Sequence, residues 1–104
     1  MKILPEPISF EWDKGNINKN FKKHKISNKE AEEVFGNKSS KIFKDINHSL
    51  KESRFVAYGK TKAGRKLTVV FTLRGQKVRV ISARDQNKKE RRVYEKEFKI
   101  DTKI

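Results

Sequence analysis

Three arginines stand where a folded chain can present them to a phosphate group. Arg84 follows an apolar, β-prone segment and precedes a charged, helical one, so we expect it to project from the edge of a sheet. Its planar guanidinium can donate two parallel hydrogen bonds to a phosphate, which a lysine cannot reproduce. Arg54 and Arg65 flank a predicted central hairpin, and the three cations converge on one concave patch if they face the same surface. The structural alternatives are an ion pair of Arg84 with Glu90 or Glu95 and, for the other two arginines, solvated charges at strand ends.

Few side chains of the sequence are candidates for proton transfer near neutral pH. His24 is one candidate, because histidine is the side-chain type best suited to exchange protons near neutral pH, but it shares a predicted helical stripe with apolar residues, so a packing role is its alternative. His48 lies in a polar loop whose turn needs polar side chains for its own hydrogen bonds. Glu52 is a further candidate base. Tyr94 lies on the apolar stripe of the last predicted helix, where we favour a core position, although its hydroxyl can reach a site from the helix edge.

The composition argues against metal and thiol chemistry. The chain has no cysteine, which excludes disulfides, a thiolate nucleophile and a zinc–thiolate site. Its two histidines and scattered carboxylates form no recognisable metal-ligand spacing. We therefore expect a site without a metal or cofactor, built from cations and one or two proton-transfer groups.

The net charge points to a polyanionic partner. The 104 residues include 27 Lys and Arg against 13 Asp and Glu, a formal charge of +14, which repels itself in the folded state and attracts nucleic acid, an acidic protein, or both in turn. Solubility alone is the alternative reading of this charge. Residues 84–96 hold six cations and three acids. Such a helix is usually a solvated face, but in so basic a chain we favour a surface that follows a nucleic-acid backbone, with these candidates: Lys23, Lys88, Lys89, Arg91 and Arg92.

The first third of the chain should carry a short strand and two helices. Residues 8–12 alternate apolar and polar side chains, as in a half-buried strand. Residues 17–24 have an apolar stripe with helical spacing. Ser27, followed three residues later by Glu30, forms a capping box that opens a second helix, and Gly36-Asn37 provides its stop signal.

The remainder should form an antiparallel meander followed by a helix. Segments 41–45, 54–58, 66–73 and 77–82 are β-prone, and the short connections between the last three favour hairpins. From residue 87 the pattern is helical again, with Glu90 at its third position, and residues 101–104 should fray. The predicted fold is a single α+β domain over residues 1–104: one antiparallel sheet with two N-terminal helices and one C-terminal helix packed on it. The sequence has no signal peptide or membrane span, so we expect a cytoplasmic protein.

Motifs along nearly the whole chain resemble one protein family, the BrnT toxins. They run in order through these segments: Phe10-Glu11-Trp12-Asp13, Asn20 with Lys23-His24, Glu30-Ala31, Val34-Phe35, Asp45, His48-Ser49, Glu52, Arg54-Phe55, Gly59, Gly64-Arg65, Arg79 to Arg84, and Glu90 with Tyr94. The most diagnostic part is the Ile81-Ser82-Ala83-Arg84 segment before a charged helix. Two departures stand out: Lys25 replaces a usual glycine at a helix end, and Asp85-Gln86 puts a negative charge beside the expected site.

The resemblance implies a RelE-like fold and a type II toxin that cleaves RNA, inhibits translation and growth, and is neutralised by a BrnA-type antitoxin. It also implies a hetero-oligomer with that antitoxin and binding of promoter DNA only through the complex. RNA cleavage without a metal needs a proton acceptor for the attacking 2′-hydroxyl, cations for the developing charge, and a proton donor for the leaving 5′-oxygen. The alternative function is a basic nucleic-acid-binding module, or an inactive toxin relic, which would share the fold and the charge.

Overall fold

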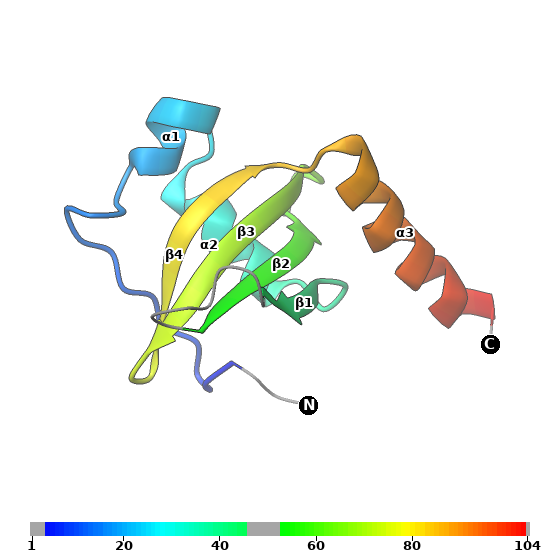
Figure 1. Cartoon of the computed structure of the whole chain (residues 1–104), viewed down its shortest axis with the longest axis horizontal. Coiled ribbons are helices and arrows are strands. Elements are labelled where there is room, and N and C mark those ends of the chain that lie inside the picture. Colours follow the sequence, from blue (N-terminus) through cyan, green and yellow to red (C-terminus); the bar gives the residue numbers. More distant parts are fainter. Residues whose placement is uncertain (1–3, 46–52, 104) are drawn as a thin grey trace.

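The computed structural model describes residues 4–45 and 53–103. The chain forms, in order, α1 (Lys19–His24), α2 (Asn28–Gly36), β1 (Lys41–Lys44), β2 (Arg54–Lys60), β3 (Lys66–Arg74), β4 (Lys77–Asp85) and α3 (Lys88–Lys103). The four strands make one antiparallel sheet in the order β1-β2-β3-β4 (Figure 1). The α+β class, the antiparallel meander and the three helices predicted from the sequence are confirmed.

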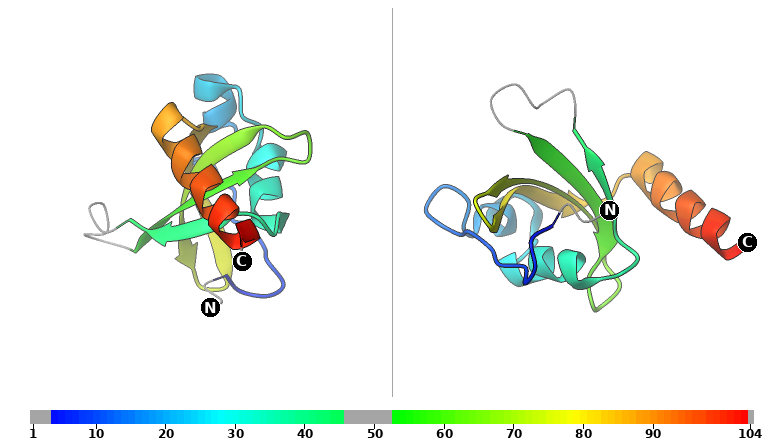
Figure 2. Two further views of the ribbon diagram at one scale, coloured as in Figure 1. Left: turned by 90° about the vertical axis from the view of Figure 1, so that its right-hand side faces the viewer. Right: turned by 90° about the horizontal axis from the view of Figure 1, so that it is seen from below.

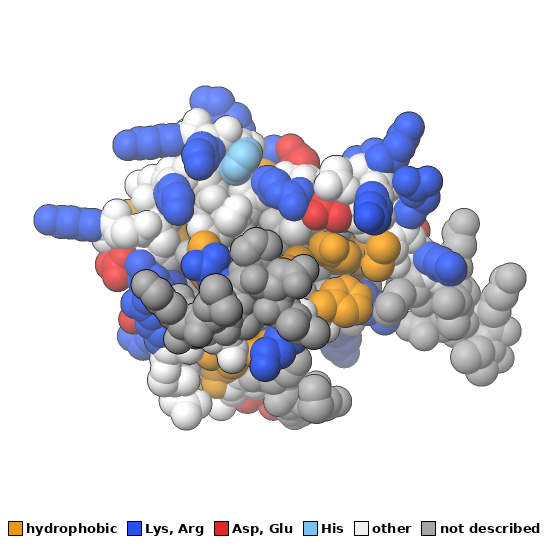
Figure 3. Space-filling view, viewed as in Figure 1, with side chains coloured by type: hydrophobic (Ala, Val, Ile, Leu, Met, Phe, Trp, Pro, Cys, Tyr) orange, Lys and Arg blue, Asp and Glu red, His pale blue; other side chains and the backbone are white. Residues whose placement is uncertain are grey.

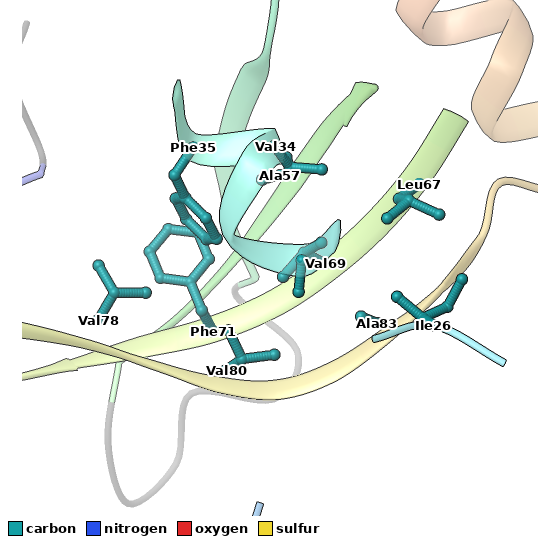
Figure 4. Packing of buried hydrophobic residues seen from close by; sticks show 11 residues of the cluster. Ile26, Val34, Phe35, Ala57, Leu67, Val69, Phe71, Val78, Val80 and Ala83 are labelled. Atoms are coloured by element: carbon teal, nitrogen blue, oxygen red, sulfur yellow. The ribbon is translucent and has the colours of Figure 1, made fainter. Parts of the chain in front are cut away.

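The hydrophobic core lies between α2 and one face of the sheet (Figure 2). Because side chains alternate across a strand, Leu67, Val69 and Phe71 of β3 all point to this face and are fully buried. Phe71 contacts the ring of Phe35 from α2 edge-on, with 4.9 Å between centroids (Figure 4). It also stacks with Phe55. Among the described residues, no helix lies over most of the opposite face of the sheet (Figure 1).

A β-bulge in β4 changes which face its last residues occupy. The β3–β4 register shifts after Val70, which pairs with Ser82, while Phe71 pairs with Val80. Ile81 is therefore an extra residue. Val80 and Ala83 are both buried in the core, although strict alternation would put residues three apart on opposite faces. The bulge thus directs Arg84 to the open face, where unbroken alternation from Val80 would have placed it in the core.

The N-terminal segment closes the free edge of β4 with side chains instead of a strand. The strand predicted over residues 8–12 is wrong in extent: only Phe10 forms a bridge, with Val78. Further along this edge, buried asparagines replace ladder bonds, since Asn16 donates to the carbonyl of Val80 and Asn20 accepts from the N–H of Ala83. Such bonds satisfy backbone groups that a buried sheet edge would otherwise leave unpaired.

This edge contact explains a second correction. The apolar stripe of the first helix was expected to face the core, but Ile17 and Phe21 are 44% and 50% exposed. Instead α1, only six residues long, turns Asn20 inward, because that side chain binds the edge of β4. The helix ends at His24 and is capped by Lys25, whose φ of 60° is left-handed, a conformation that glycine adopts with less strain.

The other two helices begin as predicted, with capping boxes. Ser27 and Glu30 exchange side-chain-to-backbone hydrogen bonds at the start of α2. Asn87 and Glu90 do the same at the start of α3. Each box satisfies backbone N–H groups that have no partner within their helix.

The contacts of α3 with the rest of the fold that the structure describes come from its first half, within residues 88–96. Glu90 and Tyr94 bind groups of the sheet and of the segment before β1, and Glu95 forms an ion pair with Lys66 of β3. Beyond these contacts α3 projects away from the sheet (Figure 1). It also continues through Lys103 and so includes most of the predicted frayed tail, because no glycine or proline interrupts it. Within the described chain, no helix is long and apolar enough to cross a membrane.

Candidate active-site groove

A groove of about 330 Å³ opens on the face of the sheet opposite α2. Its walls bring together charged, hydroxyl and apolar side chains from β2, β3, β4 and α3, and the residues lining it are Asp45, Arg54, Val56, Tyr58, Thr68, Val70, Ile81, Ser82, Arg84 and Glu90. The strand register aligns Arg84, Thr68 and Tyr58 in one row across three neighbouring strands. The groove therefore has an apolar floor with two arginines and two carboxylates around it.

Arg84 is held in the groove by a two-point ion pair. Its Nη1 and Nη2 each donate to one carboxylate oxygen of Glu90, both at 2.7 Å. Nη1 also donates to the backbone carbonyl of Asp85 at 3.3 Å. A guanidinium has five N–H donors, and within residues 4–45 and 53–96 no partner is found for Nε. The Nε–Nη2 edge of Arg84 thus remains available, and its side chain is 38% exposed.

The surroundings of Glu90 and Tyr58 shift the pKa values of these two groups in opposite directions. Burial raises the pKa of Glu90, but hydrogen bonds from Arg84, Asn87 and Thr68 outweigh burial, and the net pKa lies below its ordinary value. Burial raises the pKa of the Tyr58 hydroxyl, and the nearby negative charge of Glu90 adds to the rise. At neutral pH the groove therefore presents an ionised Glu90 beside a protonated Tyr58.

Of the three arginines expected to converge, two line the groove. Arg65 lies on the helix-covered face, where its Nε and Nη2 bind the carboxylate of Asp85 at 2.7 and 3.0 Å. Its Nη1 donates to the carbonyl of Lys25 and pairs with Glu30, so Arg65 ties both N-terminal helices to the end of the sheet. The negative charge of Asp85 is accordingly neutralised on the face opposite Arg84.

The predicted proton-transfer residues lie away from the groove or outside the described residues. His24 is the last residue of α1 and does not line the groove; its carbonyl accepts a bond from Arg65 at 3.4 Å. Tyr94 is buried, as the core alternative predicted, and its hydroxyl shares a 2.8 Å hydrogen bond with Ser39. Glu52 and His48 fall in residues 46–52, which the structure does not describe.

Tyr58 and Asp45 are groove residues that the sequence analysis did not assign to the site. The signal for Tyr58 was present, because alternation along β2 puts residues 54, 56 and 58 on one face. The same alternation along β2 identifies Val56 as part of the groove floor. Asp45 directly follows β1, and its backbone N–H bonds to the carbonyl of Arg54, which brings the two residues to the same end of the groove.

Basic side chains surround the open face. Figure 3 views this face and shows Lys and Arg side chains projecting from α1 and α3, with hydrophobic side chains where α3 meets the sheet. Of the predicted backbone-binding cations, Lys23 is exposed on α1, and Lys88, Lys89 and Arg92 are exposed on α3. Arg91 is half-buried and donates to the carbonyl of Gln86. The part of the chain that the structure describes has no group of three or more potential metal ligands.

Replacing Glu90 by glutamine should flatten the acid limb of the stability curve. A carboxyl whose folded pKa is depressed stabilises the fold above its unfolded value, here about 4.5. That stabilisation is lost as the pH falls through the folded pKa. Denaturant unfolding of both proteins at a series of acidic pH values measures the difference. Glu95→Gln is the control and should change little, because its ion pair with Lys66 is half-exposed. Parallel curves for wild type and Glu90→Gln would contradict the prediction.

Comparison with known proteins gives one family and no curated relative. Residues 12–90 match the model of a family described as "Ribonuclease toxin, BrnT, of type II toxin-antitoxin system". No curated protein matches the chain. The matched residues cover more than half of the chain and include α1, α2, the sheet and the start of α3.

Proposed function

The chain belongs to the BrnT family of ribonuclease toxins from type II toxin–antitoxin systems, and on that premise we propose that it cleaves RNA in this groove without a metal ion. The observation that supports this most strongly is the pairing of Arg84 with Glu90, which orients one guanidinium and leaves its second edge for a phosphate. Arg54 adds a second cation to the same groove. Together they supply the positive charge that metal-dependent nucleases obtain from an ion. Cleavage of cytoplasmic RNA then stops translation and growth.

The reaction is a transesterification at phosphorus. The 2′-oxygen of the RNA forms a bond to the adjacent phosphorus while the bond from phosphorus to the 5′-oxygen breaks, which gives a cyclic phosphate and a 5′-hydroxyl. The free edge of Arg84 binds the non-bridging oxygens, on which charge develops in the transition state. After both products have left, the acid regains a proton from water and the base releases one to water, so the protein returns to its starting state.

The groove residues divide the proton transfers between them. Tyr58 carries a proton at neutral pH, as an ordinary tyrosine does, and its raised pKa preserves that state, so it can donate a proton to the leaving 5′-oxygen. Glu90 is committed to its bonds with Arg84, Thr68 and Asn87. Asp45 is the second carboxylate that lines the groove, and we assign it the role of accepting the 2′-hydroxyl proton, because a carboxylate can act as a general base. Glu52 stays a predicted base outside the described residues.

The partner of a type II toxin is a protein antitoxin. We expect it to be of the BrnA type, encoded immediately downstream, with an acidic surface that covers the basic face and associates quickly at low salt. The hetero-oligomer binds its promoter DNA mainly through the antitoxin. The antiparallel sheet with its N-terminal helices on one face agrees with a RelE-like fold. A neighbouring reading frame without acidic, helical character would contradict this pairing.

The test of the proposed function is cleavage of purified RNA by the isolated protein in the presence of EDTA. We expect the wild type to cleave and Arg54→Ala to cleave at least about 10²-fold more slowly, the usual effect of losing one donor to the transition state. Arg74→Ala is the charge-matched control, because Arg74 pairs with Glu11 outside the groove. Cleavage that occurs only in a translating extract would show that the reaction requires the ribosome. Absence of cleavage in both settings would refute the proposal in favour of a binding module.

A further inference from the structure

An aromatic pair continues the apolar floor of the groove toward β1. Tyr58 lines the groove, and its ring lies beside that of Phe43, with 5.6 Å between centroids and 57° between planes. The β1–β2 register pairs Phe43 with Val56, so Phe43 shares the open face with the groove residues of β2. Unlike the other aromatic rings of the sheet, that of Phe43 is 37% exposed.

The row of side chains across the sheet connects this pair to the bound phosphate. Tyr58 and Arg84 lie on strands two apart and are aligned through Thr68, which puts about 10 Å between their backbones. A phosphate on Arg84 therefore leaves room for the base of a neighbouring nucleotide to extend over Tyr58 toward Phe43. Proteins that bind single strands combine such a basic groove with exposed aromatic rings on which bases stack.

Resting on the proposed ribonuclease function, we propose that Phe43, supported by the ring of Tyr58, stacks on an unpaired base next to the phosphate bound by Arg84. The substrate class is accordingly single-stranded RNA, because a base that is paired within a duplex has no free face on which the ring of Phe43 could stack. Stacking tolerates any base, so this contact favours unpaired segments without reading a sequence.

A binding experiment with a non-reactive ligand tests this assignment. The probe is a short 2′-O-methyl oligouridylate, which lacks the attacking hydroxyl, and its comparator is a sugar–phosphate oligomer of equal length and charge without bases. We expect Phe43→Ala to bind the oligouridylate on the order of ten- to a hundred-fold more weakly than wild type, the range measured for removal of one stacking ring. Its affinity for the abasic oligomer should equal that of wild type, and Phe43→Trp should restore oligouridylate binding.

Phe21→Ala is the matched control, because Phe21 is also exposed but lies on α1, beneath the ammonium group of Lys25. It should leave both affinities unchanged. Equal losses of affinity for both oligomers in Phe43→Ala, or no loss for either, would overturn the stacking site even if the wild type cleaves RNA. A wild type that fails to cleave RNA would instead refute the proposed function, so the two failures are distinct.

Discussion

Replacing Arg84 by lysine is expected to lower the rate of RNA cleavage by about 10²- to 10³-fold, as measured for removal of a transition-state donor in other enzymes. Lysine keeps the positive charge beside Glu90 but is a single point donor, so it cannot bind a carboxylate on one edge and a phosphate on the other. The fall should appear mainly in kcat, since the charge that attracts RNA is retained. Single-turnover cleavage in EDTA measures it directly.

Arg79→Lys provides the control for this substitution. Arg79 also makes a two-point ion pair, with Asp13 at 2.8 and 3.0 Å, but it does not line the groove. Its replacement removes a comparable fork at equal charge and should leave cleavage unchanged. Thermal unfolding of both variants shows whether either substitution disturbs the fold. Equal activity of Arg84→Lys and Arg79→Lys would remove Arg84 from the reaction.

Phe71→Ala should cost about 3–5 kcal/mol of unfolding free energy, the usual range for removing a buried phenyl ring. Phe71 is fully buried and contacts the rings of both Phe35 and Phe55, so its loss leaves a cavity between α2 and the sheet. The total free energy of unfolding of a small domain is only about 5–15 kcal/mol. Urea unfolding measures the change. Phe21→Ala, at a half-exposed ring, should stay within about 0.5 kcal/mol, and equal effects of the two would contradict this account of the core.

The elements predictable from the sequence were those fixed by local contacts. The capping box of Ser27 and Glu30 involves residues three apart, so its spacing located the start of α2. The helical pattern from residue 87, with Glu90 at its third position, located the start of α3. The alternating, β-branched segments identified the hairpins, since connections that short permit only antiparallel pairing. Arg84 and Arg54 both line the groove, and the positions of both along the chain were predictable for a related reason: each lies near the end of a strand that these patterns identify.

What could not be predicted depends on long-range geometry. The bulge at Ile81 decides which face Arg84 occupies, and strand periodicity contains no signal for it. Arg65 lies two residues before the buried Leu67, so strand alternation places both side chains on the same face. The ion pair of Arg65 with Asp85 is not predictable in this way, because it requires the two strand ends to be adjacent. The inward turn of Asn20 likewise depends on an edge of β4 that lies 63 residues away along the chain.

The asparagine contacts of the N-terminal segment leave the sheet with only one side open to growth. Phe10, Asn16 and Asn20 occupy backbone groups along β4 that a further strand would need. The other border is β1, four residues long, and in the described residues it pairs only with β2. Any chain that extends this sheet by strand addition must therefore dock on β1, beside Phe43 and within reach of the groove. A chain docked on β1 and an RNA bound in the groove would therefore compete for the same surface of the protein.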